Sequence, residues 1–201
     1  MDYLRQMELL LRGAPDGAAL LLHSCCAVCS SSVLEQLAQK FRVTVFYFNP
    51  NIFPLAEYEK RKAEQQRLIA TVAYPFPVGY IDADYDHAAF LQIAQGLEAE
   101  PEGGRRCARC FELRLRETAR RAADGNYAFF ATTLTVSPHK NAAAINEIGA
   151  ALAREYGVAW LPSDFKKQDG YLRSIWLAEQ YSLYRQNYCG CEYTFQGESH
   201  Q

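Results

Sequence analysis

The sequence of 201 residues lacks any apolar run long enough to cross a membrane. A stretch such as Ala18–Leu22 is far shorter than the roughly 18 apolar residues that a membrane-spanning helix needs. The N-terminal stretch carries Asp2, Arg5, Glu8 and Arg12, and it lacks the basic start and the small-residue cleavage site of a signal peptide. We therefore expect a soluble, cytoplasmic protein with no membrane partner.

Other absences exclude further classes. The sequence has no internal repeat and no low-complexity segment, which argues against solenoid and disordered chains. It has no P-loop and no G-x-G-x-x-G motif, so nucleotide binding has no motif support. The net charge of −2 excludes a wholly basic nucleic-acid binder, although it allows a local basic patch. Hydrophobic residues make up 49% and charged residues 22%, which is typical of a globular protein.

Apolar patterns alternate between the periods of strands and helices along the chain. The predicted strands are 18–23, 42–48, 78–81, 126–131 and 158–161, and the predicted helices are 30–40, 55–72, 84–95, 108–123, 139–156 and 171–181. Strands joined by helical crossovers predict a mostly parallel sheet with helices on both faces. We expect a single three-layer, Rossmann-like α/β domain over residues 1–201, with a C-terminal cysteine tail at 184–201.

Seven cysteines fall into three groups, and these groups are the main chemical signal of the sequence. They are Cys25, Cys26 and Cys29, then Cys107 and Cys110, then Cys189 and Cys191. In a cytosolic protein, clustered cysteines indicate metal binding or redox chemistry rather than a disulfide framework. The first group follows a predicted strand and opens a helix, where free N–H groups and the helix dipole favour thiolates.

The first two groups together supply enough sulfur ligands for an iron–sulfur cluster or a zinc site. Cys189-Gly190-Cys191 is a different kind of motif. A disulfide between cysteines separated by one residue closes a very small ring, which is strained and easily reduced. The sequence therefore predicts a redox-active pair in the tail, with further metal ligation as the alternative.

These motifs, taken in order, resemble those of the epoxyqueuosine reductase QueH family over roughly residues 20–193. The matching segments are His23-Ser24-Cys25-Cys26-Ala27-Val28-Cys29-Ser30, Tyr47-Phe48-Asn49-Pro50-Asn51-Ile52, Glu57-Tyr58 with Arg61, Arg106-Cys107-Ala108-Arg109-Cys110-Phe111 with Arg114-Leu115, Thr132-Thr133-Leu134, Ser137-Pro138-His139-Lys140, Asp164-Phe165-Lys166-Lys167, Gly170-Tyr171, and Leu183 to Cys191. Val28 stands where the family pattern leads us to expect proline, which affects only the local turn.

The resemblance implies an oxidoreductase that reduces the epoxide of epoxyqueuosine in tRNA to queuosine. It implies a [4Fe–4S] cluster held by Cys25, Cys26, Cys107 and Cys110, and a redox-active pair formed by Cys189 and Cys191. An additional iron ion is expected beside the cluster, with Cys29 and Asp164 as the candidate ligands. The implied partners are the tRNA anticodon loop that carries epoxyqueuosine and an electron donor.

Other residues fit a tRNA substrate. Seven arginines between Arg105 and Arg121 suggest a phosphate-binding surface, as do the basic residues at 60–67. Anticodon bases can splay out and stack on aromatic rings, for which Tyr47, Tyr58, Tyr171 and Tyr184 are candidates. His23 is either a ligand or proton donor beside the cysteines, or a structural histidine.

Two other function classes compete with this prediction. A sulfur-inserting tRNA enzyme would activate the base with ATP through a glycine-rich loop, but His23-Ser24-Cys25-Cys26 occupies the corresponding place. A non-catalytic zinc-binding RNA module would need no C-x-C tail.

Overall fold

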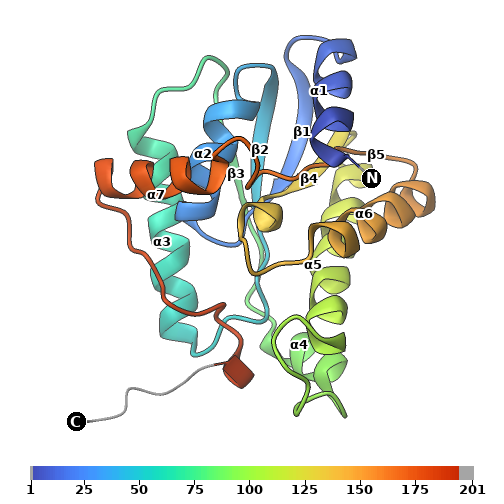
Figure 1. Cartoon of the computed structure of the whole chain (residues 1–201), viewed down its shortest axis with the longest axis vertical. Coiled ribbons are helices and arrows are strands. Elements are labelled where there is room, and N and C mark those ends of the chain that lie inside the picture. Colours follow the sequence, from blue (N-terminus) through green and yellow to red (C-terminus); the bar gives the residue numbers. More distant parts are fainter. Residues whose placement is uncertain (1, 195–201) are drawn as a thin grey trace.

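The computed structural model describes residues 2–194 and contains a five-stranded sheet in which every neighbouring pair is parallel. The strands are β1 (Ala18–His23), β2 (Phe41–Tyr47), β3 (Gly79–Asp82), β4 (Phe129–Thr132) and β5 (Ala159–Trp160). Their order is β3-β2-β1-β4-β5 (Figure 1). The chain thus builds outward from β1 to β3 and then returns to build outward on the other side. This reversal creates a topological switch point between β1 and β4.

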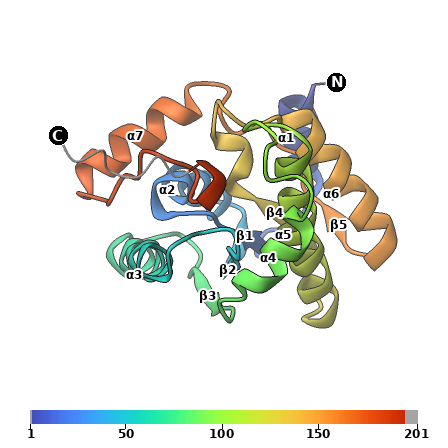
Figure 2. The ribbon, with the colours of Figure 1, turned by 90° about the horizontal axis from the view of Figure 1, so that it is seen from below.

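Helices cover both faces of the sheet, which Figure 2 shows from below. The helices are α1 (Tyr3–Gly13), α2 (Ala27–Leu37), α3 (Leu55–Thr71), α4 (His87–Ala94), α5 (Arg105–Asp124), α6 (Ala142–Tyr156) and α7 (Gly170–Gln180), and the short 3-10 helices are η1 (Thr133–Val136) and η2 (Glu192–Thr194). One hydrophobic core lies between α2 and the sheet and includes side chains of α1, α3 and α7. A second core lies between the sheet and the helices α5 and α6. The predicted three-layer α/β fold is confirmed.

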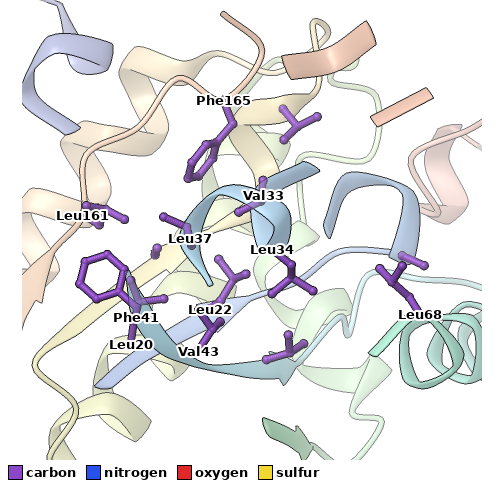
Figure 3. Packing of buried hydrophobic residues seen from close by; sticks show 14 of the residues in the cluster. Leu20, Leu22, Val33, Leu34, Leu37, Phe41, Val43, Leu68, Leu161 and Phe165 are labelled. Atoms are coloured by element: carbon purple, nitrogen blue, oxygen red, sulfur yellow. The ribbon is translucent and has the colours of Figure 1, made fainter. Parts of the chain in front are cut away.

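Strand β1 lies at the centre of both cores because its side chains alternate between the two faces. Leu20 and Leu22 point into the core beneath α2, whereas Leu21 belongs to the core beneath α5. Figure 3 shows Leu22 beneath α2 near Leu34, and Leu20 next to Phe41. A strand that is buried on both faces has a continuous apolar sequence. For this reason the predicted strand 18–23 and the observed β1 have the same bounds.

The largest differences from the predicted elements lie at turns and at the N-terminus. Residues 3–13 form α1, which Asp2 caps through its side chain, although the sequence indicated only an amphipathic stretch. Helix α5 begins at Arg105 rather than at residue 108, so both of its cysteines lie inside the helix. Strand β4 begins at Phe129 because Asn126 adopts a left-handed turn conformation. No helix within residues 2–194 is both long and apolar enough to span a membrane.

The contact between α6 and β5 gives a test of the second core. A Cβ atom added to Gly149 would lie 2.4 Å from ring atoms of Trp160. Replacing a helical glycine by alanine ordinarily stabilises a protein by roughly 0.5–1 kcal/mol. We predict that Gly149→Ala instead lowers the free energy of unfolding by about 1–3 kcal/mol, because the ring has to move. Urea denaturation measures this change.

The matched control is Gly13→Ala in α1, where an added Cβ meets no atom within 4 Å. This variant should be as stable as the wild-type chain or slightly more stable. Equal midpoints for the two alanine variants would contradict the predicted packing against Trp160.

Candidate functional site

The cysteines gather where the carboxyl ends of β1 and β4 meet, which is the switch point of the sheet. Ligand sites of open parallel sheets form at such points because the two neighbouring connections leave in opposite directions. Cys25 follows β1, and its N–H donates to Thr133 Oγ1, just after β4, over 3.2 Å. A cavity of about 610 Å³ opens beside them. The residues that line it are Cys25, Val28, Cys29, Arg61, Glu102, Arg114, Ser137, Pro138, His139, Lys140, Tyr171, Ser174, Arg185, Gln186, Asn187, Tyr188 and Cys189.

The first three cysteines form a compact thiol group at the start of α2. Their sulfur atoms all lie within 4.8 Å of one another. Cys26 is the N-cap of α2, and its sulfur accepts a hydrogen bond from the Cys29 N–H over 3.4 Å. Hydrogen bonds from Cys26 and Cys29 lower the pKa of Cys25 well below its usual value. The bond to Cys25 raises the pKa of Cys26 to about 12, and the pKa of Cys29 is also raised. The group therefore favours one thiolate supported by two thiols.

A buried polar network fixes the loop that carries these cysteines. The hydroxyl groups of Ser24 and Ser30 donate to Gln65 Oε1 over 2.6 and 2.7 Å. Asn49 Nδ2 donates to the Ser24 carbonyl over 2.8 Å. All four residues are almost completely buried. Because each lost bond would leave a buried polar group unpaired, the network holds the loop in one conformation.

His23 is a structural histidine. Its Nε2 lies 3.1 Å from the Phe48 carbonyl, which can only accept, so this nitrogen carries the proton. Its Nδ1 then accepts from the Thr132 hydroxyl over 2.8 Å. Burial, assisted by the charge of Arg114, lowers the pKa of His23 to about 3. Both ring nitrogens are therefore occupied and the ring is neutral, which decides between the two roles that the sequence left open.

The second thiol group lies in the first turns of α5. Cys110 packs against Phe90, Ala94 and Cys191, and this burial raises the pKa of its thiol to about 12. Cys107 is half-buried and packs against the same core as Cys25. The Cys107 and Cys110 sulfurs are not part of the compact group formed by the first three cysteines.

Arg114 follows Cys110 by one helical turn and lies among all three thiol groups. Its side chain is 1% exposed, its Nε donates to the Cys110 carbonyl over 3.2 Å, and its Nη2 has no hydrogen-bond partner. Burial opposes its charge, but the thiolate forms of Cys110, Cys189, Cys25 and Cys107 raise its pKa. Lys140 is affected in the same way, since Cys189, Cys25 and Cys29 raise its pKa despite burial. The sequence predicts a phosphate-binding role for Arg114, as one of the arginines at 105–121, and no role for Lys140. The spacing that places Arg114 on the α5 face of Cys107 and Cys110 is the signal for its position among the thiols.

The third thiol group, Cys189 and Cys191, lies in the segment that follows α7. Cys189 lines the cavity, whereas Cys191 is buried against Cys110. Gly190 between them has φ +101°, a conformation that favours glycine. A Gln186 amide from the same segment donates to Cys26 Sγ over 3.0 Å. Three distant segments of the sequence thus bring their thiols to one site.

Asp164 lies elsewhere. It binds Lys166 and lines a second cavity of about 160 Å³, which none of the seven cysteines lines. Cys29, its suggested partner in binding an additional iron, belongs instead to the compact group at the start of α2.

Two expectations about an RNA surface are wrong in part. Arg106 and Arg114 are buried, while Arg116 and Arg120 pair with acidic residues, so residues 105–121 do not form a free basic face. The number of arginines in a sequence does not show which of them pair with acidic residues of other helices, as Arg116 does with Glu155. The rings of Tyr47 and Tyr58 are buried beneath the site and are unavailable for stacking. Tyr171 lines the cavity, and Tyr184 bonds to Glu57.

The parallel sheet and its switch point define an α/β protein with a cysteine group that could hold a metal ion. Comparisons with known proteins give the family. The family model described as epoxyqueuosine reductase QueH matches residues 20–197. A protein named epoxyqueuosine reductase QueH from Streptococcus pyogenes is 43% identical over 177 residues, which cover 87% of this chain and 69% of the relative. The chain belongs to the epoxyqueuosine reductase QueH family.

Two further relatives carry the same name. The protein from Staphylococcus epidermidis is 44% identical over 176 residues, which cover 86% of this chain and 74% of that protein. The protein from Thermotoga maritima is 33% identical over 178 residues, which cover 87% of this chain and 89% of that protein. The match to the family model, over residues 20–197, includes all three cysteine groups.

Gly190 offers a test of the packing at the third thiol group. An added Cβ would lie 3.0 Å from Arg61 Nη1 and from Ile52 Cγ1, at a positive φ. We predict that Gly190→Ala lowers the free energy of unfolding by about 2–4 kcal/mol, from backbone strain together with overpacking. The control is Gly103→Ala, which has φ +87° but meets nothing within 4 Å. It carries the backbone cost alone, about 1–2 kcal/mol. Equal losses in chemical denaturation would show that the packing around Gly190 does not matter.

Proposed function

We propose that this chain reduces the epoxide of epoxyqueuosine in tRNA to the cyclopentene of queuosine, using an iron–sulfur cluster and the Cys189–Cys191 pair. The observation that carries the proposal is that thiols of all three groups lie close enough to the buried Arg114 to affect its pKa. Beside Arg114 is a cavity that Cys25, Cys29, Cys189 and the half-buried Lys140 line. Membership of the epoxyqueuosine reductase family supports the reaction and its tRNA substrate.

The donor set suits a thiolate-bound, negatively charged metal group. Cys25, Cys26, Cys107 and Cys110 are the proposed ligands of a [4Fe–4S] cluster. Cys29 is the proposed ligand of an additional iron, whereas Asp164, which lines the second cavity, is not. A buried guanidinium with an unpartnered Nη2 fits such a site, because an isolated buried cation is costly and needs a nearby negative charge. When bound, the cluster supplies single electrons at a potential set by its surroundings.

The electron balance favours a separate role for the tail cysteines. Conversion of the epoxide to an alkene consumes two electrons and two protons and releases the oxygen as water. Oxidation of the Cys189 and Cys191 thiols to a disulfide releases two electrons and two protons, and an external dithiol restores the pair. Cys189 lines the cavity in which a substrate would bind.

The surface around the cavity is better suited to bind a nucleotide than the arginine-rich surface of α5 is. Arg185 and His139 are exposed there, Lys140 is half-buried, and Tyr171 offers an aromatic ring. These groups combine positive charge with a stacking surface, which is the combination that single-stranded RNA loops require. We therefore place the anticodon loop at this mouth, with the modified base directed into the cavity.

The metal content tests the proposed ligands. After anaerobic reconstitution, we expect a broad absorption band at roughly 400 nm and about four sulfides per chain. Cys107→Ser and Cys110→Ser should lose most of the iron and sulfide. Cys189→Ser and Cys191→Ser are the matched controls and should retain both. A colourless chain with one zinc ion, unchanged after reconstitution, would favour a structural zinc module.

Turnover tests the role of the tail pair. With epoxyqueuosine-containing tRNA and a dithiol as donor, we expect the double variant Cys189→Ser/Cys191→Ser to lose multiple turnover by at least about 100-fold, because the electron pair is no longer supplied. Its iron and sulfide content should equal that of the wild-type chain. Full turnover of this variant with both dithionite and a dithiol would exclude the pair from the reaction. A requirement for ATP would instead indicate a sulfur-inserting enzyme.

A further inference from the structure

The segment 181–191, here called the strap, carries the C-x-C pair but forms neither helix nor strand. It leaves α7 and runs alongside α3 (Figure 1). Few of its backbone groups bond to other backbone groups; the Phe53 N–H, for example, donates to the Gly190 carbonyl over 2.8 Å. The position of the two cysteines must therefore come mainly from side chains that bind the strap.

Helix α3 supplies these side chains along one face. Near the start of the strap, Arg67 donates to the carbonyls of Tyr181 and Ser182 over 3.1 and 2.9 Å. In the middle, Glu64 accepts from the Tyr184 N–H over 2.8 Å, and Glu57 accepts from the Tyr184 hydroxyl. Most of these bonds reach the strap through its backbone.

Arg61 makes the contact nearest to the cysteines. Its Nη1 donates to the Cys189 carbonyl over 3.1 Å, and its Nη2 donates to the Tyr188 carbonyl over 3.4 Å. Its Nε binds Glu57 Oε1 over 2.6 Å, which fixes the plane of the guanidinium. The side chain is only 2% exposed and also lies over the ring of Tyr188. Two of its nitrogens thus bind the strap, and the third binds Glu57, which orients them.

We propose that Arg61, oriented by Glu57, is the positioning residue of the Cys189–Cys191 pair. It acts on the backbone carbonyls and thereby keeps Cys189 in the cavity and Cys191 against Cys110. The planar fork of arginine matters here, because two carbonyls and a carboxylate are bound from one side chain. The inference deepens the proposed redox function and rests on it for its catalytic consequence, but the positioning itself is testable separately.

The experiment measures how fast each cysteine is alkylated in the metal-free, fully reduced chain. Iodoacetamide pulses followed by mass spectrometry give a rate for every thiol. Arg61→Lys retains the charge but cannot bind both carbonyls together with Glu57. We expect this variant and Arg61→Gln to raise the rate at Cys189 by on the order of 10-fold, the effect of losing a charge-assisted bond.

Two controls separate positioning from general loosening of the fold. Cys107 is half-buried at the start of α5 and serves as the internal reference, since its rate should stay constant. Arg67→Lys makes the same substitution on the same helix, at the far end of the strap. It should leave the Cys189 rate within about twofold of the wild-type value, because Arg61 still holds the cysteines.

A rate at Cys189 that stays at the wild-type value in both Arg61 variants would overturn the proposal, as would an equal rise at Cys189 and Cys107. In reconstituted enzyme, Arg61→Lys should keep its iron and sulfide but lose multiple turnover with a dithiol donor. If the wild-type chain proves inactive on epoxyqueuosine-containing tRNA, the proposed function fails, while the alkylation rates still decide the role of Arg61.

Discussion

The parallel pairing of β1 with β2 on one side and β4 on the other is the constraint on which the rest of the structure depends. It brings the end of β1 beside the end of β4, so that Cys25 meets Thr133 across 108 positions of sequence. The same pairing sends the following chain into α2, whose N-terminus Cys26 caps. The first thiol group is therefore located by the sheet and by the start of α2.

Charge compensation is the second organising factor. Arg114 and Lys140 come from α5 and from the loop before α6, and thiols from all three groups act on the pKa of one or both cations. Buried cations of this kind are unfavourable unless negative charge lies close by. His23, whose two ring nitrogens are both hydrogen-bonded, is neutral and contributes no charge of its own. The two cations thus offset negative charge on thiolates nearby, and both cluster ligation and dithiol chemistry would require such thiolates.

The three thiol groups are held in physically different ways. A strand end and a helix N-terminus fix the first group, and the interior of α5 fixes the second. The third depends on side chains of α3, above all Arg61, because the strap has almost no regular backbone pairing. This arrangement suits the dithiol role proposed for Cys189 and Cys191, since a segment held by a few side-chain bonds rearranges more readily than a strand does.

The sequence by itself determined the layered fold and the membership of each thiol group. Continuous apolar runs such as 18–23 are diagnostic of strands buried on both faces, and cysteines adjacent in sequence stay adjacent in space. Only the tertiary structure decided which groups meet, how the arginines are used and where Asp164 lies. Arg61, Arg106 and Arg114 look alike in the sequence as members of basic runs, yet all three are buried. Arg61 binds the distant Cys189 carbonyl, and thiols from distant segments affect the pKa of Arg114, whereas Arg106 binds carbonyls of the loop before its own helix. Such contacts follow from the folded path of the chain, which a local sequence pattern does not encode.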